Sequence, residues 1–167
     1  MSDNSISVTG DLWLGKKNTD SILNTLRNVL CDAGHSVKMT AYSLTYSAEF
    51  FDLLESVLKK GIPATIIINK YNNVEFDRVR DLVSRLIRNY PNFIVKDFNS
   101  DDGDLHAKII VIDHQLDNCQ ALIGSANLSW RGITKNHELL IKLTGESAET
   151  VGDLFELISQ KASRINK

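Results

Sequence analysis

The residues best suited to chemistry in this 167-residue chain are a histidine and a lysine two positions apart, His106 and Lys108. They stand at the start of an apolar run, 107–113, that predicts a strand. Side chains two residues apart on a strand point to the same face, so the imidazole and the ammonium are expected to project together. An imidazole can attack phosphorus, and a neighbouring ammonium can hold anionic oxygens. The pair therefore favours phosphoryl chemistry.

Further polar residues follow the next predicted strand, 120–123. Ser125 and Asn127 supply a hydroxyl and an amide there, and backbone N–H groups beside them can also bind a phosphate. The apolar residues that continue the strand face of the His/Lys pair are expected to form core, which places the reactive pair at the mouth of its strand. None of these features is decisive alone, but together they predict a phosphate-binding site.

The whole pattern is H-x-K-x4-D from His106 to Asp113, followed by G-S-x-N from Gly124 to Asn127. It resembles the HKD motif of the phospholipase D superfamily, with every position filled. Ten residues further on, Asn136-His137-Glu138 is similar to the N-x-E segment of that family. The resemblance covers about residues 104–143 and implies a phosphodiesterase with a phospholipase D-like fold.

The resemblance also implies a role for each matching residue. His106 would be the nucleophile that forms a phosphohistidine intermediate. Glu138 would hold the other nitrogen of this histidine and fix its tautomer. The structural residues of the motif would be Gly124 and Asp113, with Asp113 pointing away from the phosphate to anchor local structure. The phosphoryl oxygens would be bound by three residues: Lys108, Ser125 and Asn127.

The mechanism that the resemblance implies needs two histidines, one to attack phosphorus and one to protonate the leaving oxygen. Large family members carry two H-x-K motifs, whereas His35, His114 and His137 of this chain lack a lysine two residues on. We therefore expect a homodimer with a composite active site on its two-fold axis, to which each subunit gives His106 and Lys108. No metal or other cofactor is implied, because the protein's own cations neutralise charge.

Residues around the motif allow more than one interpretation. Trp130 and Arg131 follow the phosphate cradle and are expected to bind substrate, with a base stacked on the indole; an aromatic ring packed under the loop is an equal alternative. His114 lies in a predicted turn, where exposure is expected. A metal site of His137 with His106 and Asp113 is disfavoured, because a lysine in the site repels a cation.

Charged residues outside the motif have plain interpretations as well. The acids just before His106 predict a polar loop, although they can also bias substrate choice: Asp101, Asp102 and Asp104. Three arginines share one face of a predicted helix but are interrupted by Asp81, which favours a solvated face: Arg78, Arg85 and Arg88.

The rest of the chain must position these groups. Amphipathic periodicity predicts helices over residues 20–33, 48–60, 74–90 and 147–165, with Ser47 as an N-cap and Gly34 and Gly61 as stops. Apolar runs predict strands over residues 37–44, 62–68, 93–98, 107–113, 120–123 and 138–143, and a hairpin is expected around Thr9-Gly10-Asp11. Helices alternating with buried strands indicate one α/β domain over residues 1–167, with a mixed, mostly parallel sheet sandwiched between helical layers.

Composition narrows the classes of protein. The chain is 43% hydrophobic and 24% charged, which suits one globular core. No apolar run approaches the roughly 20 residues that cross a bilayer, and the first residues do not resemble a signal peptide, so a cytoplasmic protein without membrane contact is expected. The net charge of −2 and pI of 6.1 argue mildly against nucleic acid as a partner, although a local basic patch can serve.

These observations favour a metal-independent nuclease that cleaves DNA or RNA, because small dimeric members of the family with one motif are similar in size and layout. The first alternative is a phospholipase or phosphatidyltransferase, which needs an apolar groove beside the site. The second is a nuclease or binding module of a larger restriction or defence system, in which other domains recognise the target.

Overall fold

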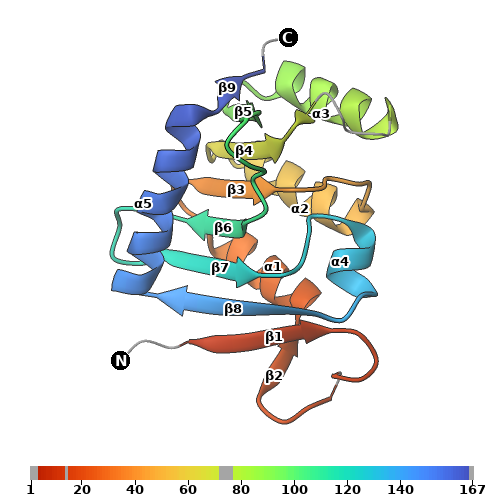
Figure 1. Cartoon of the computed structure of the whole chain (residues 1–167). Coiled ribbons are helices and arrows are strands. Elements are labelled where there is room, and N and C mark those ends of the chain that lie inside the picture. Colours follow the sequence, from red (N-terminus) through yellow and green to blue (C-terminus); the bar gives the residue numbers. More distant parts are fainter. Residues whose placement is uncertain (1–3, 14, 72–76, 166–167) are drawn as a thin grey trace.

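Within the described residues, nine strands form one β-sheet through the middle of the molecule (Figure 1). The computed structural model describes residues 4–13, 15–71 and 77–165. The order across the sheet is β2-β1-β8-β7-β6-β3-β4-β5-β9. The strands are β1 (Ser5–Thr9), β2 (Thr19–Ser21), β3 (Val37–Ala41), β4 (Ala64–Asn69), β5 (Phe93–Phe98), β6 (Lys108–Ile112), β7 (Gln120–Gly124), β8 (Glu138–Thr144) and β9 (Ser163–Arg164).

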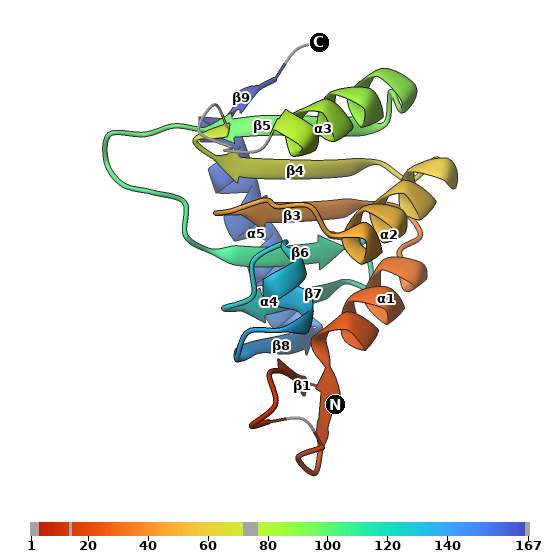
Figure 2. The same ribbon diagram turned by 90° about the vertical axis from the view of Figure 1, so that its right-hand side faces the viewer.

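Helices cover both faces of the sheet (Figure 2). They are α1 (Ile22–Asp32), α2 (Ala48–Lys59), α3 (Asp77–Asn89), α4 (Trp130–Thr134) and α5 (Glu146–Lys161). Alternate residues of β6 show the division, since Ile110 and Ile112 join the core under α1, α2 and α3, whereas Ile109 and Val111 pack against α5. A two-residue repeat produces this alternation. The predicted mixed sheet between helical layers is therefore confirmed. None of the described helices is long and apolar enough to span a membrane.

The expectation of a mostly parallel sheet is wrong. Among the described pairings, β1–β2, β3–β4 and β4–β5 are parallel. The other five are antiparallel: β6–β7 and β7–β8, where the chain turns back at each step, together with β3–β6, β1–β8 and the edge pairing β5–β9. This arrangement has a consequence for function: the carboxyl end of β3 lies beside the amino end of β6.

Two expectations at the chain ends are also wrong. The proposed hairpin around Gly10 does not form, since β1 pairs in parallel with β2 and antiparallel with β8. The turn at Gly10 instead starts a loop after which β2 runs in the same direction as β1. The last helix ends at Lys161 rather than near residue 165, because Ser163 and Arg164 pair with the edge of β5.

The other boundaries follow the predicted pattern with small shifts. Ser47 caps α2 by accepting a hydrogen bond from the Phe50 N–H, and Gly61 ends that helix with a φ of 80°. β3 stops three residues before the predicted end, and β4 starts two residues after the predicted start. Of the predicted helix over residues 74–90, the part 74–76 lies outside the described residues.

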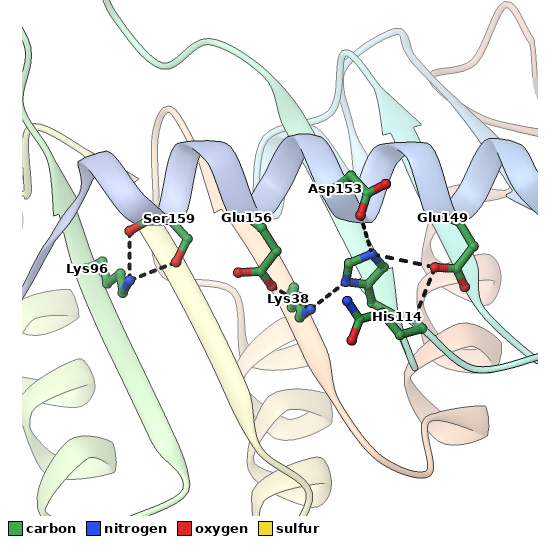
Figure 3. A network of polar contacts seen from close by, with 8 residues as sticks. Lys38, Lys96, His114, Glu149, Asp153, Glu156 and Ser159 are labelled. Carbon is green, nitrogen blue, oxygen red and sulfur yellow. Dashed lines mark hydrogen bonds and ion pairs between the residues drawn. The ribbon is translucent and has the colours of Figure 1, made fainter.

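Partly buried polar contacts attach α5 to the sheet (Figure 3). Lys38 Nζ lies 2.8 Å from His114 Nδ1, and His114 Nε2 lies 3.2 Å from Asp153 Oδ1. Because lysine only donates, Nδ1 is the acceptor and Nε2 carries the hydrogen toward Asp153. Lys96 Nζ donates to the carbonyl and the hydroxyl of Ser159 at 2.8 and 2.7 Å. The prediction that His114 is exposed is wrong, because α5 covers it and leaves 7% accessible.

Gly152 makes this packing possible, and Gly152→Ala is expected to lower the free energy of unfolding by about 3 kcal/mol, the upper end for an overpacked interior. An added Cβ would lie 2.1 Å from His114 Cδ2, which outweighs the gain of about 1 kcal/mol in helix propensity. Urea denaturation measures the change. Adding His114→Ala should restore part of the loss, and Gln160→Ala on the same helix should change little. A Gly152→Ala variant as stable as wild type would contradict this packing.

Candidate active site

His106 and Lys108 lie side by side where β6 begins. Lys108 Nζ is 2.8 Å from Nδ1 and 3.2 Å from Nε2 of the His106 ring, and it donates to the His106 carbonyl at 2.6 Å. A lysine ammonium has no acceptor, so the ring nitrogen that binds it must offer a lone pair. The imidazole of His106 is exposed, whereas Lys108 is 8% exposed. The arrangement thus presents an exposed imidazole beside a buried lysine.

Thr40 of β3 holds the backbone of this pair in place. Its hydroxyl donates to the Ala107 carbonyl at 2.6 Å and accepts from the Ile109 N–H at 3.0 Å. The regular register between β3 and β6 extends only to Met39 and Ile110, so the threonine side chain replaces the next rungs of the ladder. His106 therefore projects from a fixed strand end although it lies outside the strand.

Tyr42 belongs to the site and was not among the predicted site residues. Its ring centroid is 4.4 Å from that of His106, and Lys108 Nζ lies 5.2 Å from the Tyr42 centroid. The tyrosine is 37% exposed and directly follows β3. The available signal was an aromatic residue at the end of a buried strand, but the sequence does not show that β3 and β6 are neighbours.

Glu138 is bound by residues of its own region. Ser125 Oγ donates a short hydrogen bond to Oε2, and Asn136 Nδ2 donates to Oε1 at 3.2 Å. Burial lowers the pKa of Lys108 from its usual 10.5, and the negative charge of Glu138 offsets part of this effect. A hydrogen bond from His106 to Glu138, as the resemblance implied, is not among the contacts of the described chain.

Asn127 and Gly124 complete the second half of the motif. Asn127 and Lys108 line the same small cavity of about 10 Å³. In the part of the chain that the structure describes, Asn127 Oδ1 is buried without a hydrogen-bond partner. Gly124 is required sterically, because an added Cβ would lie 2.0 Å from the Leu139 carbonyl oxygen. The strand end beside Lys108 therefore combines close backbone contact with unused hydrogen-bonding capacity.

The loops that carry Tyr42 and Asn127 lie against each other. Leu44 and Leu128 form a parallel bridge, and the Thr45 N–H donates to the Leu128 carbonyl at 3.3 Å. Trp130 and Arg131 follow as the first residues of α4, and both are exposed. Because 45% of Trp130 is accessible, the alternative in which its ring packs under the loop does not hold.

Asp113 occupies the opposite end of β6 from His106. Its carboxylate is fully buried and accepts hydrogen bonds from the N–H groups of Gly34, His35 and Ser36 and from Asn118 Nδ2. Gly34 is therefore not a helix stop in the left-handed conformation but a donor to this carboxylate. Burial acts to raise the pKa of Asp113, and the hydrogen bonds from Ser36, His35, Gly34 and Asn118 outweigh it and lower the pKa below the usual 3.8.

Asp113→Asn is expected to lower the free energy of unfolding by about 3 kcal/mol at pH 7, because charged-acceptor hydrogen bonds are lost and an amide N–H₂ faces backbone donors. A carboxyl group with a lowered pKa stabilises the fold above its usual pKa, and this contribution is lost as the pH falls through the folded-state pKa. The difference between variant and wild type should therefore shrink below pH 4. Urea titrations at pH 7 and pH 3 measure it, and an equal difference at both would contradict the assignment.

The acidic loop before His106 is partly neutralised. Lys70 Nζ lies 2.8 Å from Asp104 Oδ1, and the Leu105 N–H donates to Asn69 Oδ1 at 2.9 Å. Both contacts attach the loop to the end of β4. Among the described residues, histidine, cysteine and acidic side chains do not gather in groups of three that could hold a metal ion.

Residues 26–161 match the protein family described as "Cardiolipin synthase, PLD-like domain". A curated relative, the DISARM protein DrmC of Bacillus paralicheniformis, is 30% identical over 141 residues, which are 80% of this chain and 54% of the relative. The chain thus spans about half the length of that relative.

Two solved structures are similar in fold. NucT from Helicobacter pylori superimposes with a TM-score of 0.76 at 23% identity, over 99% of this chain and 100% of that one. Nuc from Salmonella typhimurium, a phospholipase D family member, gives 0.77 at 15% identity, with 100% of both chains covered.

Proposed function

The chain belongs to the phospholipase D-like family of phosphodiesterases, and from this premise we propose that it is a nuclease that cleaves DNA or RNA through a phosphohistidine at His106. The observation that carries the proposal is the exposed His106 imidazole with the Lys108 ammonium 2.8 Å from Nδ1. A nucleophile and a phosphate-binding cation are thereby held in one place. The similarity in fold to proteins named NucT and Nuc favours nucleic acid over lipid as the substrate.

The proposed reaction has two steps. A ring nitrogen of His106 attacks phosphorus, an N–P bond forms, and the P–O bond to the leaving oxygen breaks while that oxygen receives a proton. Water then attacks phosphorus, gives up a proton, and releases the phosphate monoester and the free imidazole. Lys108 and Asn127 bind the phosphoryl oxygens in both steps. Trp130 and Arg131 bind the substrate beside the cleaved bond. The reaction as proposed is independent of metal ions.

The proton for the leaving oxygen requires a second imidazole, and a homodimer would supply it. His35 and His114 flank Asp113 at the far end of β6, about 16 Å of strand away. His137 Nε2 accepts from the Leu12 N–H at 3.4 Å, and its ring packs edge-on against Trp13. We infer that a second copy brings its own His106 across a two-fold axis, where Glu138, already held by Ser125 and Asn136, can accept from an imidazole.

The relative named DISARM protein DrmC supports one extension of the proposal. It is about twice as long as the aligned region, and it shares 30% identity across most of this chain. We propose that this chain acts as the nuclease unit of a larger restriction or defence system, in which other components select the target.

A cleavage assay tests the proposed function. The purified protein is incubated with end-labelled single- and double-stranded DNA and RNA in excess EDTA, and products are resolved by electrophoresis. Cleavage in EDTA that yields a phosphate monoester supports a metal-independent nuclease. Failure to cut any nucleic acid, combined with hydrolysis of phosphatidylcholine, would replace it with the lipid alternative. Light scattering that shows an active monomer would exclude the composite site.

A further inference from the structure

Exposed aromatic rings gather at one edge of the sheet. Four aromatic side chains of the described residues are more than a third accessible: Trp13, Tyr42, Tyr46 and Trp130. Tyr42 and Tyr46 follow the carboxyl end of β3, Trp130 follows that of β7, and Trp13 follows that of β1. β6 and β8 run antiparallel to these strands, so the amino ends of β6 and β8 lie at this same end of the sheet. His106 lies there, just before β6. The left of Figure 2 shows this edge, with the loops before β6 and α4.

Tyr46 stands apart from the catalytic pair and has a basic partner. The Arg78 guanidinium carbon lies 4.0 Å from the centroid of its ring, and Phe51 stacks with that ring at an interplanar angle of 19°. Arg78 lies in the first turn of α3, which follows β4, so it belongs to the same sheet edge as His106. Arg78 of α3 and Phe51 of α2 thus both pack against the Tyr46 ring, and these three side chains form one stack.

A surface depression of about 370 Å³ opens beside this stack and is lined by Tyr46, Arg78, Asp81, Leu82 and Arg85. Two guanidinium groups face one carboxylate there, so the lining has an excess of positive charge although the whole chain has a net charge of −2. Arg85 and Tyr46 also line a second hollow of about 80 Å³, which the acidic residues Asp52 and Glu55 line as well. Two of the three arginines interpreted from sequence as a solvated face, Arg78 and Arg85, therefore border a site-sized recess.

We propose that this recess binds an unpaired nucleotide of the same nucleic acid strand that is cleaved at His106. The base continues the stack on the Arg78–Tyr46 layer, and Arg85 binds a backbone phosphate. Bases stack on aromatic rings and on guanidinium planes only when they are free of a duplex, so the substrate class is single-stranded nucleic acid. The inference rests on the proposed nuclease function and adds a strand requirement and a subsite to it.

The test compares two substrates for each variant. One is a single-stranded oligonucleotide long enough to pass from His106 to Tyr46, and the other is bis(p-nitrophenyl) phosphate, which is too small to reach the recess. Tyr46→Ala and Arg78→Gln should each raise the KM for the oligonucleotide about 10-fold more than the KM for the small diester. Arg85→Gln, which removes the proposed phosphate contact, should reduce the salt dependence of oligonucleotide binding by about one charge. Leu157→Ala, on the exposed side of α5, is the matched control.

The outcomes separate the subsite from the nuclease function. Tyr46→Phe keeps the ring and should retain most of the oligonucleotide affinity, which also shows that the alanine effect is not misfolding. If the wild type cleaves single strands but Tyr46→Ala and Arg78→Gln lose nothing against Leu157→Ala, the subsite is wrong and the nuclease remains. Equal affinity of the wild type for duplex and single strands would also overturn the subsite. A wild type that hydrolyses only the small diester overturns both.

Discussion

His106→Ala is expected to lower the rate of phosphodiester cleavage by at least about 10⁴-fold, the scale of loss when a covalent nucleophile is removed. The histidine is exposed and forms contacts with Lys108 and Tyr42 at the site, so its removal leaves the buried core intact. Single-turnover cleavage of a labelled substrate in EDTA measures the loss. Wild-type protein quenched in alkaline SDS should in addition carry an acid-labile, base-stable phosphoryl adduct, which the alanine variant lacks.

His137→Ala is the matched control, because His137 lies at the same edge of the sheet but is engaged with Leu12 and Trp13. It should retain activity within about tenfold of the wild type, because the loss of a general acid or base lowers the rate by at least about 10²-fold. If cleavage survived in His106→Ala and disappeared in His137→Ala, the nucleophile would be His137 and not His106.

Mixing equal amounts of wild type and His106→Ala should give heterodimers without activity. A mixture with half of the wild-type activity would argue against a shared site.

The part of the site that the sequence predicted is the part set by local periodicity. His106 and Lys108 two residues apart meet because a strand repeats every two residues, and Ile110 and Ile112 enter the core for the same reason. The buried helix faces and the cap at Ser47 follow similar short-range rules. None of these requires knowledge of which strands are neighbours.

The features that sequence reasoning missed depend on long-range contacts. Tyr42 meets His106 only because β3 and β6 are adjacent, although 64 positions separate the two residues. His114 is buried because α5 crosses its turn, a contact permitted by the absence of a side chain at Gly152. The parallel pairing of β1 with β2 likewise depends on how a loop returns, which the turn signal at Gly10 does not specify. Topology therefore decides where local rules do not.

Lys108→Met is expected to lower the cleavage rate by about 10³-fold, because a preorganised cation that stabilises developing charge is lost while the side-chain volume is nearly kept. Removing a charge that is 8% exposed should not destabilise the fold, so urea denaturation provides the folding control. A rate within a few-fold of the wild type would show that the ammonium does not contact the reacting phosphate.

The pH dependence of the wild type provides the complementary test of Lys108. Burial lowers the pKa of this lysine below 10.5, so the alkaline loss of activity should occur below the pH at which an ordinary lysine titrates. The Lys108 ammonium in the unfolded chain binds its proton more tightly than in the folded protein. Raising the pH through the range between the folded and unfolded pKa values of Lys108 therefore stabilises the fold, so deprotonation of Lys108 does not lose activity by unfolding the protein. Lys108→Arg keeps its charge throughout and should move the alkaline limb to higher pH at a reduced maximal rate. An unchanged limb in Lys108→Arg would assign the titration to another group and remove Lys108 as the essential cation.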